Sequence, residues 1–536
     1  MTKKIELLDC TLRDGAYIVD AKFGTPAIKG IIRKMQDANA EIIECGWLKD
    51  SPHQEGTTFY HVPADLEQYI TEKSPYSKYV VMIDWNRYNL DFLPQNDGKS
   101  IDAVRVVFPK DRVSEGMQLG KIIKSKGYDV FFQASNTLGY SDDELLALAE
   151  AVNEQKPVAL SVVDTFGAMF TEDLEHIVRI LDDKLDKDIK LGFHSHNNQQ
   201  LSFALSMRFV ELLKESERGC IVDASLCGMG RGAGNATTEL VASYLNRKQQ
   251  GNYDMNDVMD AIDMYMTYFQ NNYSWGYSTP YFIAGMYCTH VNNIAYLLKN
   301  HRTNAKDMRN VIESLQLEDR LKYDYDILEQ RYLDYQDKGI DDNQAIEHLT
   351  AALRNRKVLL LLPGKSVKEK SDVIKQYILD NSPIVISVND IFEEYNADFA
   401  FFSNKLRYNY EKNIDADRFD SIKRIIVSRI KTHADDSEIL VNFNFLVKRG
   451  WEHFDNAGIM CLRLLNKLHV ENVALAGFDG FGSVHGDNYA NPEQPHINPG
   501  KDWDDLNAEI KDMLVDFRTS TAGSMNIEFI TPSKYE

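Results

Sequence analysis

The sequence predicts an α/β protein made of an N-terminal (β/α)8 TIM barrel, a helical extension and a C-terminal Rossmann-like α/β domain. Three observations lead to this prediction. The chain has 536 residues, which is too long for one ordinary domain. Short β-branched apolar runs alternate with helix-length segments through the first 226 residues. This rhythm stops near residue 253 and resumes after residue 356.

The first half contains eight apolar runs that we interpret as barrel strands. Each is almost continuously hydrophobic, as expected for a parallel strand covered on both faces. Eight strands alternating with helices over about 230 residues is the pattern of a (β/α)8 barrel. The runs are Ile5–Leu12, Ala40–Trp47, Tyr79–Trp85, Ala103–Pro109, Asp129–Ser135, Ala159–Thr165, Lys190–Asn197 and Cys220–Leu226.

The segments between these runs support the barrel over its alternative. Ala27–Ala38 and Asp142–Asn153 place apolar residues at helical spacing, and Ser141 is a suitable N-cap for the second segment. The alternative is an open doubly wound sheet, which usually carries G-x-G-x-x-G after its first strand. Here the first strand is followed by Thr-Leu-Arg-Asp-Gly, which favours the barrel.

The second half divides into a helical part and an α/β part. Asn256–Phe269 and His290–Leu298 have the pattern of packed helices, and Leu317–Asn355 is a charged segment typical of a solvated helical connector. A strand rhythm then returns. We therefore expect a barrel over 1–285, a helical extension over 286–356 and an α/β domain over 357–536.

The strands expected in the C-terminal domain alternate with helices such as Val367–Asp380 and Ala457–His469. Alternation of this kind predicts a Rossmann-like sheet. The expected strands are Lys357–Leu362, Pro383–Val388, Ala397–Ser403, Glu438–Asn444, Asn472–Gly477 and Asn526–Thr531.

Composition narrows the class of protein. Acidic residues outnumber basic ones by 81 to 60, so the formal charge is −21, which argues against a nucleic-acid partner. We find no apolar run long enough for a membrane span and no signal-peptide pattern at the start. Six scattered cysteines without a CxxC pair indicate reduced thiols. We therefore expect a cytoplasmic protein with no membrane partner.

Polar side chains stand near the ends of the predicted barrel strands, where barrel enzymes carry their active sites. They include Arg13 and Asp14 after the first strand, Glu44 in the second, Arg105 in the fourth and Asp164 in the sixth. Any one of them could be a solvated loop residue or half of a structural ion pair. As a set they predict a site for an anionic small molecule, with Arg13 and Arg105 as counter-charges.

His194-Ser-His196 at the end of the seventh predicted strand is the sharpest signal. Side chains two apart on a strand point to the same face, so both imidazoles can converge on one ion. Asp14 follows strand one, and alternate strands contribute side chains to a common layer in a barrel. Asp14, His194 and His196 thus form a candidate site for a divalent metal. A buried histidine pair satisfied by neighbouring asparagines is the alternative.

The segment after the eighth strand is Gly228-Met-Gly-Arg-Gly-Ala-Gly-Asn235. Its glycines allow backbone N–H groups to approach a ligand closely, and a helix is expected from Thr237. The loop is either an anion site or a means of bringing Asn235 to the metal. A plain flexible turn is the alternative.

Together these motifs resemble the metal-dependent aldolase and hydroxymethylglutaryl-CoA lyase-like superfamily, the DRE-TIM metallolyases. The resemblance rests on Asp9-Cys-Thr-Leu-Arg-Asp-Gly15, His194-Ser-His-Asn197 and Gly234-Asn235, with Glu41–Gly46 and Asp164–Gly167 also similar. It covers roughly residues 1–300. The Gly-Asn pattern, and the lack of Glu-Gln after Arg-Asp-Gly, make the chain most similar to the 4-hydroxy-2-oxovalerate aldolases.

The resemblance implies roles for individual residues. Asp14, His194 and His196 would ligate Mn²⁺ or Mg²⁺, and Asn235 would be a further ligand. A 2-oxo acid substrate would bind there, held by Arg13, Glu44, Arg105 and Asp164. Cleavage of a carbon–carbon bond beside a carbonyl leaves an enolate, and Arg13 would lie against its charge. The alternative for Arg13 is an ion pair that holds Asp14 or Glu44.

The chain departs from the aldolases at the proton-transfer residue. Those enzymes place a histidine base shortly after Arg-Asp-Gly, whereas Tyr17 stands at or near that position here. A tyrosine with a pKa near 10 is a poorer base at neutral pH unless its surroundings lower that pKa. Either Tyr17 takes the role, or the base is His290 or Tyr281 after the barrel, or the reaction differs.

The predicted function is a divalent-metal-dependent aldolase that cleaves or forms a 4-hydroxy-2-oxo acid through a pyruvate-type enolate. A Claisen-type acyl-CoA synthase and a degenerate barrel scaffold are alternatives. A homo-oligomer is expected, and the resemblance implies an aldehyde dehydrogenase as a partner. A further alternative is a bifunctional protein of glycan or nucleotide-sugar metabolism, in which the C-terminal domain would be a transferase or would bind a nucleotide.

The C-terminal domain carries its own weak signals. Leu361-Leu-Pro-Gly-Lys-Ser366 follows its first strand and would open a helix, where an anion is favoured, although P-loop spacing is absent. With Ser387-Val-Asn389 and Phe402-Ser-Asn404 it is faintly similar to Rossmann-like domains of bacterial glycan-modifying transferases. This interpretation predicts binding of a nucleotide or nucleotide sugar. A scaffold or oligomerisation domain is the alternative.

Overall fold

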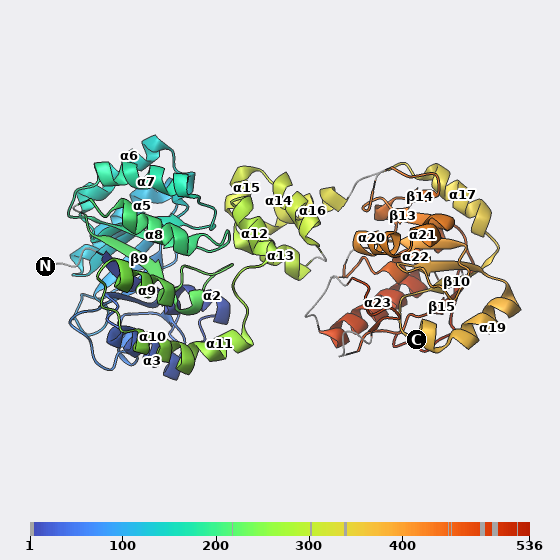
Figure 1. The fold of residues 1–536 in the computed structure, drawn as a ribbon, viewed down its shortest axis with the longest axis horizontal. Helices are drawn as coiled ribbons and strands as arrows, with labels where there is room; N and C mark the ends of the chain where they lie inside the picture. The colour runs from blue at the N-terminus through green and yellow to red at the C-terminus, as the bar shows by residue number, and fades with distance from the viewer. Residues whose placement is uncertain are drawn as a thin grey trace. The chain divides into compact units, whose positions relative to one another are not determined.

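The structure is a computed structural model of the 536-residue chain. It describes residues 5–216, 218–300, 303–336, 340–431, 433–448, 450–451, 453–482, 488–495, 502–521 and 524–536. Two compact units emerge, one of residues 1–294 and 316–323, the other of residues 295–315 and 324–536. The helical extension expected over 286–356 is therefore shared between them. Figure 1 shows the elements of each unit.

The first unit contains the closed barrel that the sequence predicts. Its strands follow one another around the sheet in chain order, and β1 pairs in parallel with both β2 and β9, which closes the ring. A two-residue strand, β3 (Phe59–Tyr60), is added beside β2. The barrel strands are β1 (Ile5–Asp9), β2 (Ile42–Leu48), β4 (Lys78–Asp84), β5 (Ala103–Phe108), β6 (Asp129–Ala134), β7 (Ala159–Asp164), β8 (Lys190–Ser195) and β9 (Cys220–Ala224).

Helices surround these strands and bury their apolar faces against them (Figure 1). The predicted Ser141 cap is present: Ser141 Oγ accepts the Glu144 N–H at 3.3 Å in a capping box, which fixes the start of α6. The barrel helices are α1 (Thr11–Asp14), α2 (Ala16–Val19), α3 (Thr25–Asp37), α4 (Ala64–Glu67), α5 (Val113–Ser125), α6 (Asp142–Gln155), α7 (Thr171–Lys184), α8 (Ser202–Leu212) and α9 (Thr238–Lys248).

Further helices follow the barrel. The helix expected over Asn256–Phe269 contains a π-helical turn at Ile262–Met266 between two α-helical pieces. The helices are α10 (Met255–Ala261), α11 (Thr267–Asn272), α12 (Thr279–Met286), α13 (Val291–Asn300), α14 (Ala305–Ser314), α15 (Leu317–Leu321), α16 (Tyr325–Gln336) and α17 (Asn343–Leu353).

The second unit is built on a parallel sheet in the order β14-β13-β12-β11-β10-β15-β16. The direction of strand succession reverses between β10 and β15, as in doubly wound α/β sheets. The strands are β10 (Lys357–Leu361), β11 (Ile384–Val388), β12 (Phe399–Phe402), β13 (Lys423–Val427), β14 (Glu438–Val441), β15 (Asn472–Ala476) and β16 (Asn526–Phe529).

The helices between these strands are α18 (Ser366–Glu369), α19 (Ser371–Asn381), α20 (Lys405–Ile414), α21 (Ala416–Ser421), α22 (Ala457–Lys467) and α23 (Trp503–Ser520). The strand β13 was missed in the sequence. It begins with Lys423 and Arg424, and Arg424 is buried because its guanidinium bonds the carbonyls of Phe419 and Ile422. Because the strand begins with two charged residues, its apolar part is only three residues long, and the sequence pattern did not reveal it.

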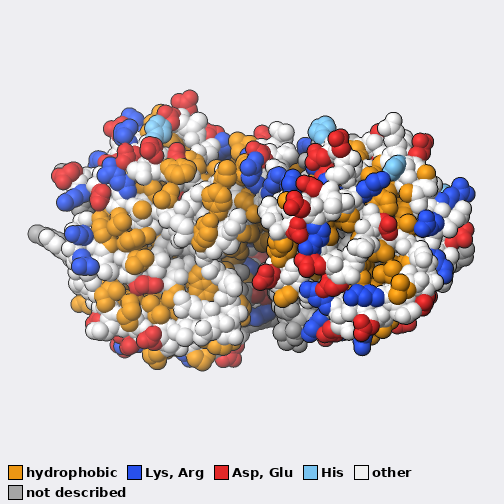
Figure 2. All heavy atoms as spheres, turned by 45° about the vertical axis from the view of Figure 1, so that its right-hand side comes forward, with side chains coloured by type: hydrophobic (Ala, Val, Ile, Leu, Met, Phe, Trp, Pro, Cys, Tyr) orange, Lys and Arg blue, Asp and Glu red, His pale blue; other side chains and the backbone are white. Residues whose placement is uncertain are grey.

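The surface carries both signs of charge. On the face shown in Figure 2, Lys and Arg side chains are interspersed with Asp and Glu, and neither sign covers a continuous area. Among the described residues, every helix is too short or too polar to span a membrane.

Candidate metal centre and its surroundings

The three predicted metal ligands converge in the barrel. Asp14 ends the short helix α1 directly after β1, His194 lies in β8 and His196 follows that strand. All three side chains are buried, and one ligand atom from each lies within 4.8 Å of the others. The three residues lie close together because β1 and β8 are both neighbours of β9 in the closed sheet.

The protonation states of Asp14 and His196 suit a metal. Burial raises the pKa of Asp14, but Arg13 and the two histidines outweigh that effect and hold it well below its usual value. Burial lowers the pKa of His196 to about 4, which leaves a neutral imidazole. A carboxylate and neutral imidazoles are the forms that bind divalent ions.

His194 supplies the clearest sign of a missing partner. Its Nε2 is buried and has no hydrogen-bond partner among the described residues. Its Nδ1 lies 3.2 Å from Asp223 Oδ2, although the angle is unsuitable for a hydrogen bond. A buried polar atom without a partner costs about 1–3 kcal/mol, so a ligand for Nε2 would be stabilising.

Asn235 completes this group from the glycine-rich loop. Its Nδ2 donates to Asp14 Oδ2 at 2.7 Å, while its buried Oδ1 has no partner among the described residues. The loop needs glycine to make this approach, because a Cβ at Gly230 would stand 2.2 Å from Asn235 Nδ2 and 2.5 Å from Asp14 Oδ2. Asn235 therefore orients Asp14 and offers a free oxygen beside it.

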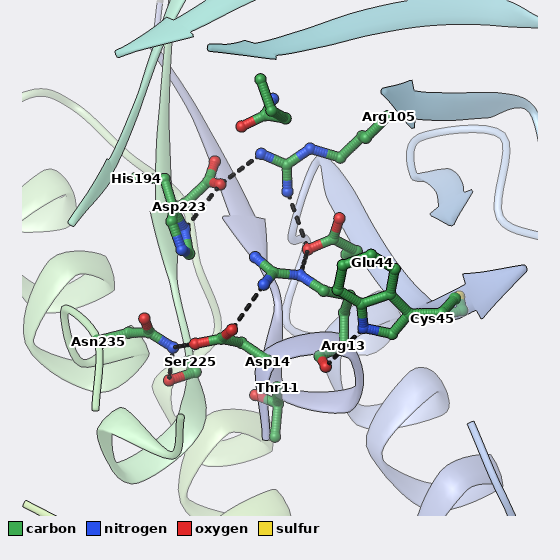
Figure 3. A network of polar contacts seen from close by, with 12 residues as sticks. Thr11, Arg13, Asp14, Glu44, Cys45, Arg105, His194, Asp223, Ser225 and Asn235 are labelled. Carbon is green, nitrogen blue, oxygen red and sulfur yellow. Dashed lines mark hydrogen bonds and ion pairs between the residues drawn. The ribbon is translucent and has the colours of Figure 1, made fainter. Parts of the chain in front are cut away.

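Arg13 and Arg105 lie in one buried ion-pair network with three carboxylates (Figure 3). Arg13 Nη1 contacts Asp14 Oδ1 at 2.6 Å, and its Nε contacts Glu44 Oε2 at 2.8 Å. Arg105 contacts the same Glu44 oxygen through Nη1 at 2.9 Å and Asp223 Oδ2 through Nη2 at 2.5 Å. The network thus runs without interruption from Asp14 to Asp223, which stands beside His194.

This network fixes the charge of Arg13 as well as its position. Burial disfavours the charge, but Glu44 and Asp14 outweigh it and hold the pKa of the guanidinium well above its usual value. Trp47 lies beside it, with the guanidinium carbon 5.9 Å from the ring centroid. Arg13 is therefore a rigid cation next to the predicted ligands.

Tyr17 and His290, the predicted proton-transfer residues, are linked by Arg231. The guanidinium carbon of Arg231 lies 4.7 Å from the Tyr17 ring centroid, and its Nη2 donates to Asn292 Oδ1 at 2.8 Å. The Asn292 N–H in turn donates to His290 Nδ1 at 3.2 Å. Tyr17 is 44% exposed, so it remains open to a small molecule.

The pKa values of these two groups differ from the near-neutral pKa that suits a general base. Although part of the residue is exposed, desolvation of its phenol group raises the pKa of Tyr17 despite the opposing effects of Arg231 and Arg13, so the phenol is protonated at neutral pH. Burial is the main cause that lowers the pKa of His290 to about 3, and Arg231 and Arg87 contribute to the same shift. With Nδ1 accepting a hydrogen bond, the neutral His290 ring carries its proton on Nε2.

Asp164 and Tyr281 are the remaining predicted site residues, and neither belongs to the ion-pair network. Asp164 accepts the N–H groups of Ala168 at 2.8 Å and Met169 at 3.3 Å, so it organises the loop after β7. Burial raises its pKa to about 7. Burial also raises the pKa of Tyr281, on α12. The predicted roles of Asp164 in substrate binding and of Tyr281 in proton transfer stay predictions.

Sequence reasoning gave no role to Asp223 and Arg231. Asp223 joins Arg105 to His194, which no local pattern reveals, because the three residues come from different strands. Its position near the end of the eighth strand was the available signal. Arg231 stands inside the glycine-rich loop, and as its only charged residue it could have been singled out.

Comparisons with known proteins find relatives for part of this chain. The HMGL-like family model matches residues 109–265. A 4-hydroxy-2-oxovalerate aldolase of Salinispora arenicola is 30% identical over 268 residues, 49% of this chain and 75% of that protein. Another, from Geobacillus genomosp. 3, is 24% identical over 265 residues, 48% of this chain and 76% of that protein.

An oxaloacetate decarboxylase of Mycobacterium tuberculosis is 26% identical over 265 residues, 48% of this chain and 74% of that protein. Each of these three matches covers about half of the chain. They give no support to the predicted likeness between residues 357–536 and glycan-modifying transferases.

Proposed function

Because the chain belongs to the HMGL-like family of aldolases and lyases, we propose that its barrel is a divalent-metal-dependent carbon–carbon lyase. The proposed reaction cleaves or forms a 4-hydroxy-2-oxo acid and passes through a pyruvate-type enolate. The relatives named 4-hydroxy-2-oxovalerate aldolase motivate this choice of substrate class.

One observation carries the proposal: three buried potential ligands meet beside a fixed guanidinium. Asp14, His194 and His196 offer ligand atoms within 4.8 Å of one another. Arg13 is bonded to Asp14 at 2.6 Å. A scaffold barrel has no need to bury an unpartnered imidazole nitrogen next to a carboxylate and an arginine.

The residues present fit a divalent metal. His194 Nε2 and Asn235 Oδ1 are buried atoms with no hydrogen-bond partner in the described part of the chain, and an ion would satisfy both. Two imidazoles with carboxylate and amide oxygens suit Mn²⁺ or Mg²⁺, with open positions for a substrate. When bound, the metal supplies Lewis-acid stabilisation of the negative charge on a 2-oxo acid.

Arg13 provides a fixed positive charge where the enolate develops. Glu44 Oε2 at 2.8 Å and Asp14 Oδ1 at 2.6 Å hold the guanidinium before substrate arrives. Little reorganisation is therefore needed as the carbon–carbon bond breaks, and such preorganised charge is usually a large part of catalysis. Glu44 pairs with Arg13, and Arg105 pairs with the same Glu44 oxygen. These two residues therefore hold Arg13 in place and set the shape of the substrate site.

Tyr17 and His290 move protons at the mouth of the site. The raised pKa of Tyr17 suits donation from Oη rather than abstraction, and the Nε2–H of His290 is a second donor. In the synthetic direction the Tyr17 Oη–H or the His290 Nε2–H donates its proton to the aldehyde oxygen. Cleavage is the reverse step, so it requires that same group in its deprotonated form to accept the proton of the 4-hydroxyl group. The homo-oligomer and the aldehyde dehydrogenase partner remain part of the proposal.

Metal analysis combined with an activity assay tests this function. We expect wild-type protein to bind Mn²⁺ and to release pyruvate from 4-hydroxy-2-oxo acids, and the His194→Ala/His196→Ala variant to lose both. His176→Ala is the matched control, because His176 is an exposed barrel histidine bonded to Asp142 at 2.7 Å. Unchanged Mn²⁺ binding in the double variant would refute the site.

Oxaloacetate decarboxylation is the second candidate activity, motivated by the mycobacterial relative. Loss of carbon dioxide from oxaloacetate produces the same enolate, so the same Arg13 would serve. Parallel assays with oxaloacetate and with a 4-hydroxy-2-oxo acid separate the two. A substrate preference for oxaloacetate would replace the aldol proposal and leave the proposed metal site intact.

A further inference from the structure

The second unit has a cavity at the carboxyl edge of its parallel sheet. Its walls include residues 362–364 after β10, residues 477–481 after β15 and Asn389 after β11. β10 and β15 are the neighbours between which the strand order reverses. Open α/β sheets bind ligands at this point of reversal. About 1090 Å³ of atom-free space, including the open mouth, lies between the walls.

Arg407, in the first turn of α20, lines this cavity. The residue is only 6% exposed, and its Nη1 is buried without a hydrogen-bond partner among the described residues. Burial lowers the pKa of the guanidinium, because the nearby acids compensate its charge incompletely. Buried charges are normally paired, whereas Arg407 forms no ion pair with a described residue, so an external anion would complete its pairing.

The other charged groups of the cavity are already paired. Arg429 Nη1 contacts Asp455 Oδ2 at 2.7 Å, and its Nε donates to the carbonyl of Ser403 at 2.9 Å. Asp479 Oδ2 accepts the Ser366 N–H at 2.7 Å. The helix start after Leu361, where the sequence predicts an anion, thus holds a carboxylate of the chain itself. Arg407 is left as the place for an external one.

The rest of the wall indicates what else the ligand carries. Five aromatic residues line the same cavity, namely Phe478, Phe481, Tyr489, Trp503 and Tyr535. The Tyr489 ring lies under Arg407, with 4.8 Å from the guanidinium carbon to the ring centroid. Aromatic residues do not contribute to binding a simple inorganic anion, whereas a ring-bearing molecule packs well against them.

The start of α22 adds a second feature suited to phosphate. Ala457 and Gly458 line the cavity at the N-terminus of this eleven-residue helix. Helix N-termini favour negative charge through their free N–H groups and their dipole. Arg407 and this helix end are thus two anion-attracting groups on one cavity with aromatic walls.

We propose that this cavity binds a nucleotide, with its phosphate at Arg407 and its base against the aromatic wall. The site belongs to the second unit and is independent of the metal centre. Failure of the aldolase proposal would therefore leave it standing, and its own failure would leave the aldolase proposal standing.

Titration calorimetry on the full chain tests the proposal. The probes are UDP, CDP, ADP and GDP, with ribose 5-phosphate and inorganic phosphate as probes without a base. We expect at least one nucleotide to bind, and Arg407→Gln to weaken it about 10-fold or more through loss of a charge-assisted bond. Lys412→Gln, an exposed cation on the same helix, should leave the affinity unchanged.

Three results would overturn the proposal. They are no binding of any nucleotide at about 1 mM, equal binding by Arg407→Gln, and phosphate binding as tight as nucleotide binding. Hydrogen exchange on the wild-type chain localises the ligand without any variant. Nucleotide should protect residues 405–410, 456–460 and 477–481, and protection confined to the barrel would contradict the assignment.

Discussion

The barrel site and the cavity of the second unit occupy equivalent places, at the carboxyl ends of parallel strands, but they treat buried arginines differently. In the barrel, Arg13 and Arg105 are paired with Asp14, Glu44 and Asp223. In the second unit, Arg407 forms no ion pair with a described residue, and the nearby acids offset the burial of its charge only in part.

This difference separates two tasks that an arginine can perform. A guanidinium held by carboxylates is a fixed charge that is ready before the substrate arrives, as catalysis requires. A buried guanidinium whose charge the chain compensates only in part can pair with the anionic group of a ligand, as binding requires. Similar sheet edges can therefore serve chemistry or binding, depending on which charges the chain itself compensates.

The largest expected effect is on barrel stability. Arg105→Met removes the shared partner of Glu44 and Asp223 and leaves two buried carboxylates without it. We expect a loss of about 3–5 kcal/mol in the free energy of unfolding of the barrel, measured by denaturant titration. Arg33→Met is the control, because its ion pair with Asp37 at 2.9 Å is exposed to solvent and contributes little to stability. Equal losses in both variants would contradict the view of a buried network.

The next effect is on catalysis. Arg13→Lys keeps the charge but cannot contact Asp14 and Glu44 with one planar group. We expect kcat for pyruvate release to fall about 100- to 1,000-fold, with a much smaller change in KM. A change in KM alone would show that Arg13 binds the substrate without acting on the enolate.

A smaller effect is expected for Asn235→Ala. The substitution removes the hydrogen bond to Asp14 Oδ2 and the free amide oxygen, so Mn²⁺ affinity should fall about 10- to 100-fold. Mn²⁺ binding followed by electron paramagnetic resonance measures this change. Affinity equal to that of the wild type would remove Asn235 from the site.

The smallest effect concerns pH and the second unit. The pKa of Asp390 is raised from 3.8 to about 7, mainly by burial and also by Glu411, against the opposing effects of Arg407 and Lys368. The folded state therefore holds this proton more tightly than the unfolded state. Its stabilisation is complete below about pH 4 and is lost as the pH rises to about 7.

Asp390→Asn removes this titration. At pH 8 we expect the free energy of unfolding of the variant to exceed that of the wild type by about 1 kcal/mol or more. One pKa unit corresponds to about 1.4 kcal/mol. The two proteins should converge near pH 4. Thermal unfolding followed across this pH range is the measurement, and a constant difference between them would contradict the assignment.

Much of the barrel could be predicted because its signals are local. Eight apolar runs gave its eight strands, and the spacing of His194 and His196 placed both rings on one face. The pairing of His194 with Asp223 could not be predicted, because it depends on the register between β8 and β9. The strand β13 was concealed by Lys423 and Arg424 at its start.

The second unit was harder for a related reason. The sequence drew attention to the helix start at Ser366, where the structure places the chain's own Asp479. Arg407 lies in a helix of mixed charge, and nothing in its neighbourhood along the chain marks it. Its importance comes from the absence of a partner, which only the packing of distant segments reveals.

Exchange of the methyl protons of pyruvate with deuterated water tests the central claim most directly. Enolate formation is the step that the metal ligands and Arg13 are proposed to serve, and NMR follows it without knowledge of the aldehyde. We predict exchange by the Mn²⁺-loaded wild type, and loss of exchange in His194→Ala/His196→Ala but not in His176→Ala. Wild-type protein that binds Mn²⁺ yet exchanges no methyl protons would contradict the account.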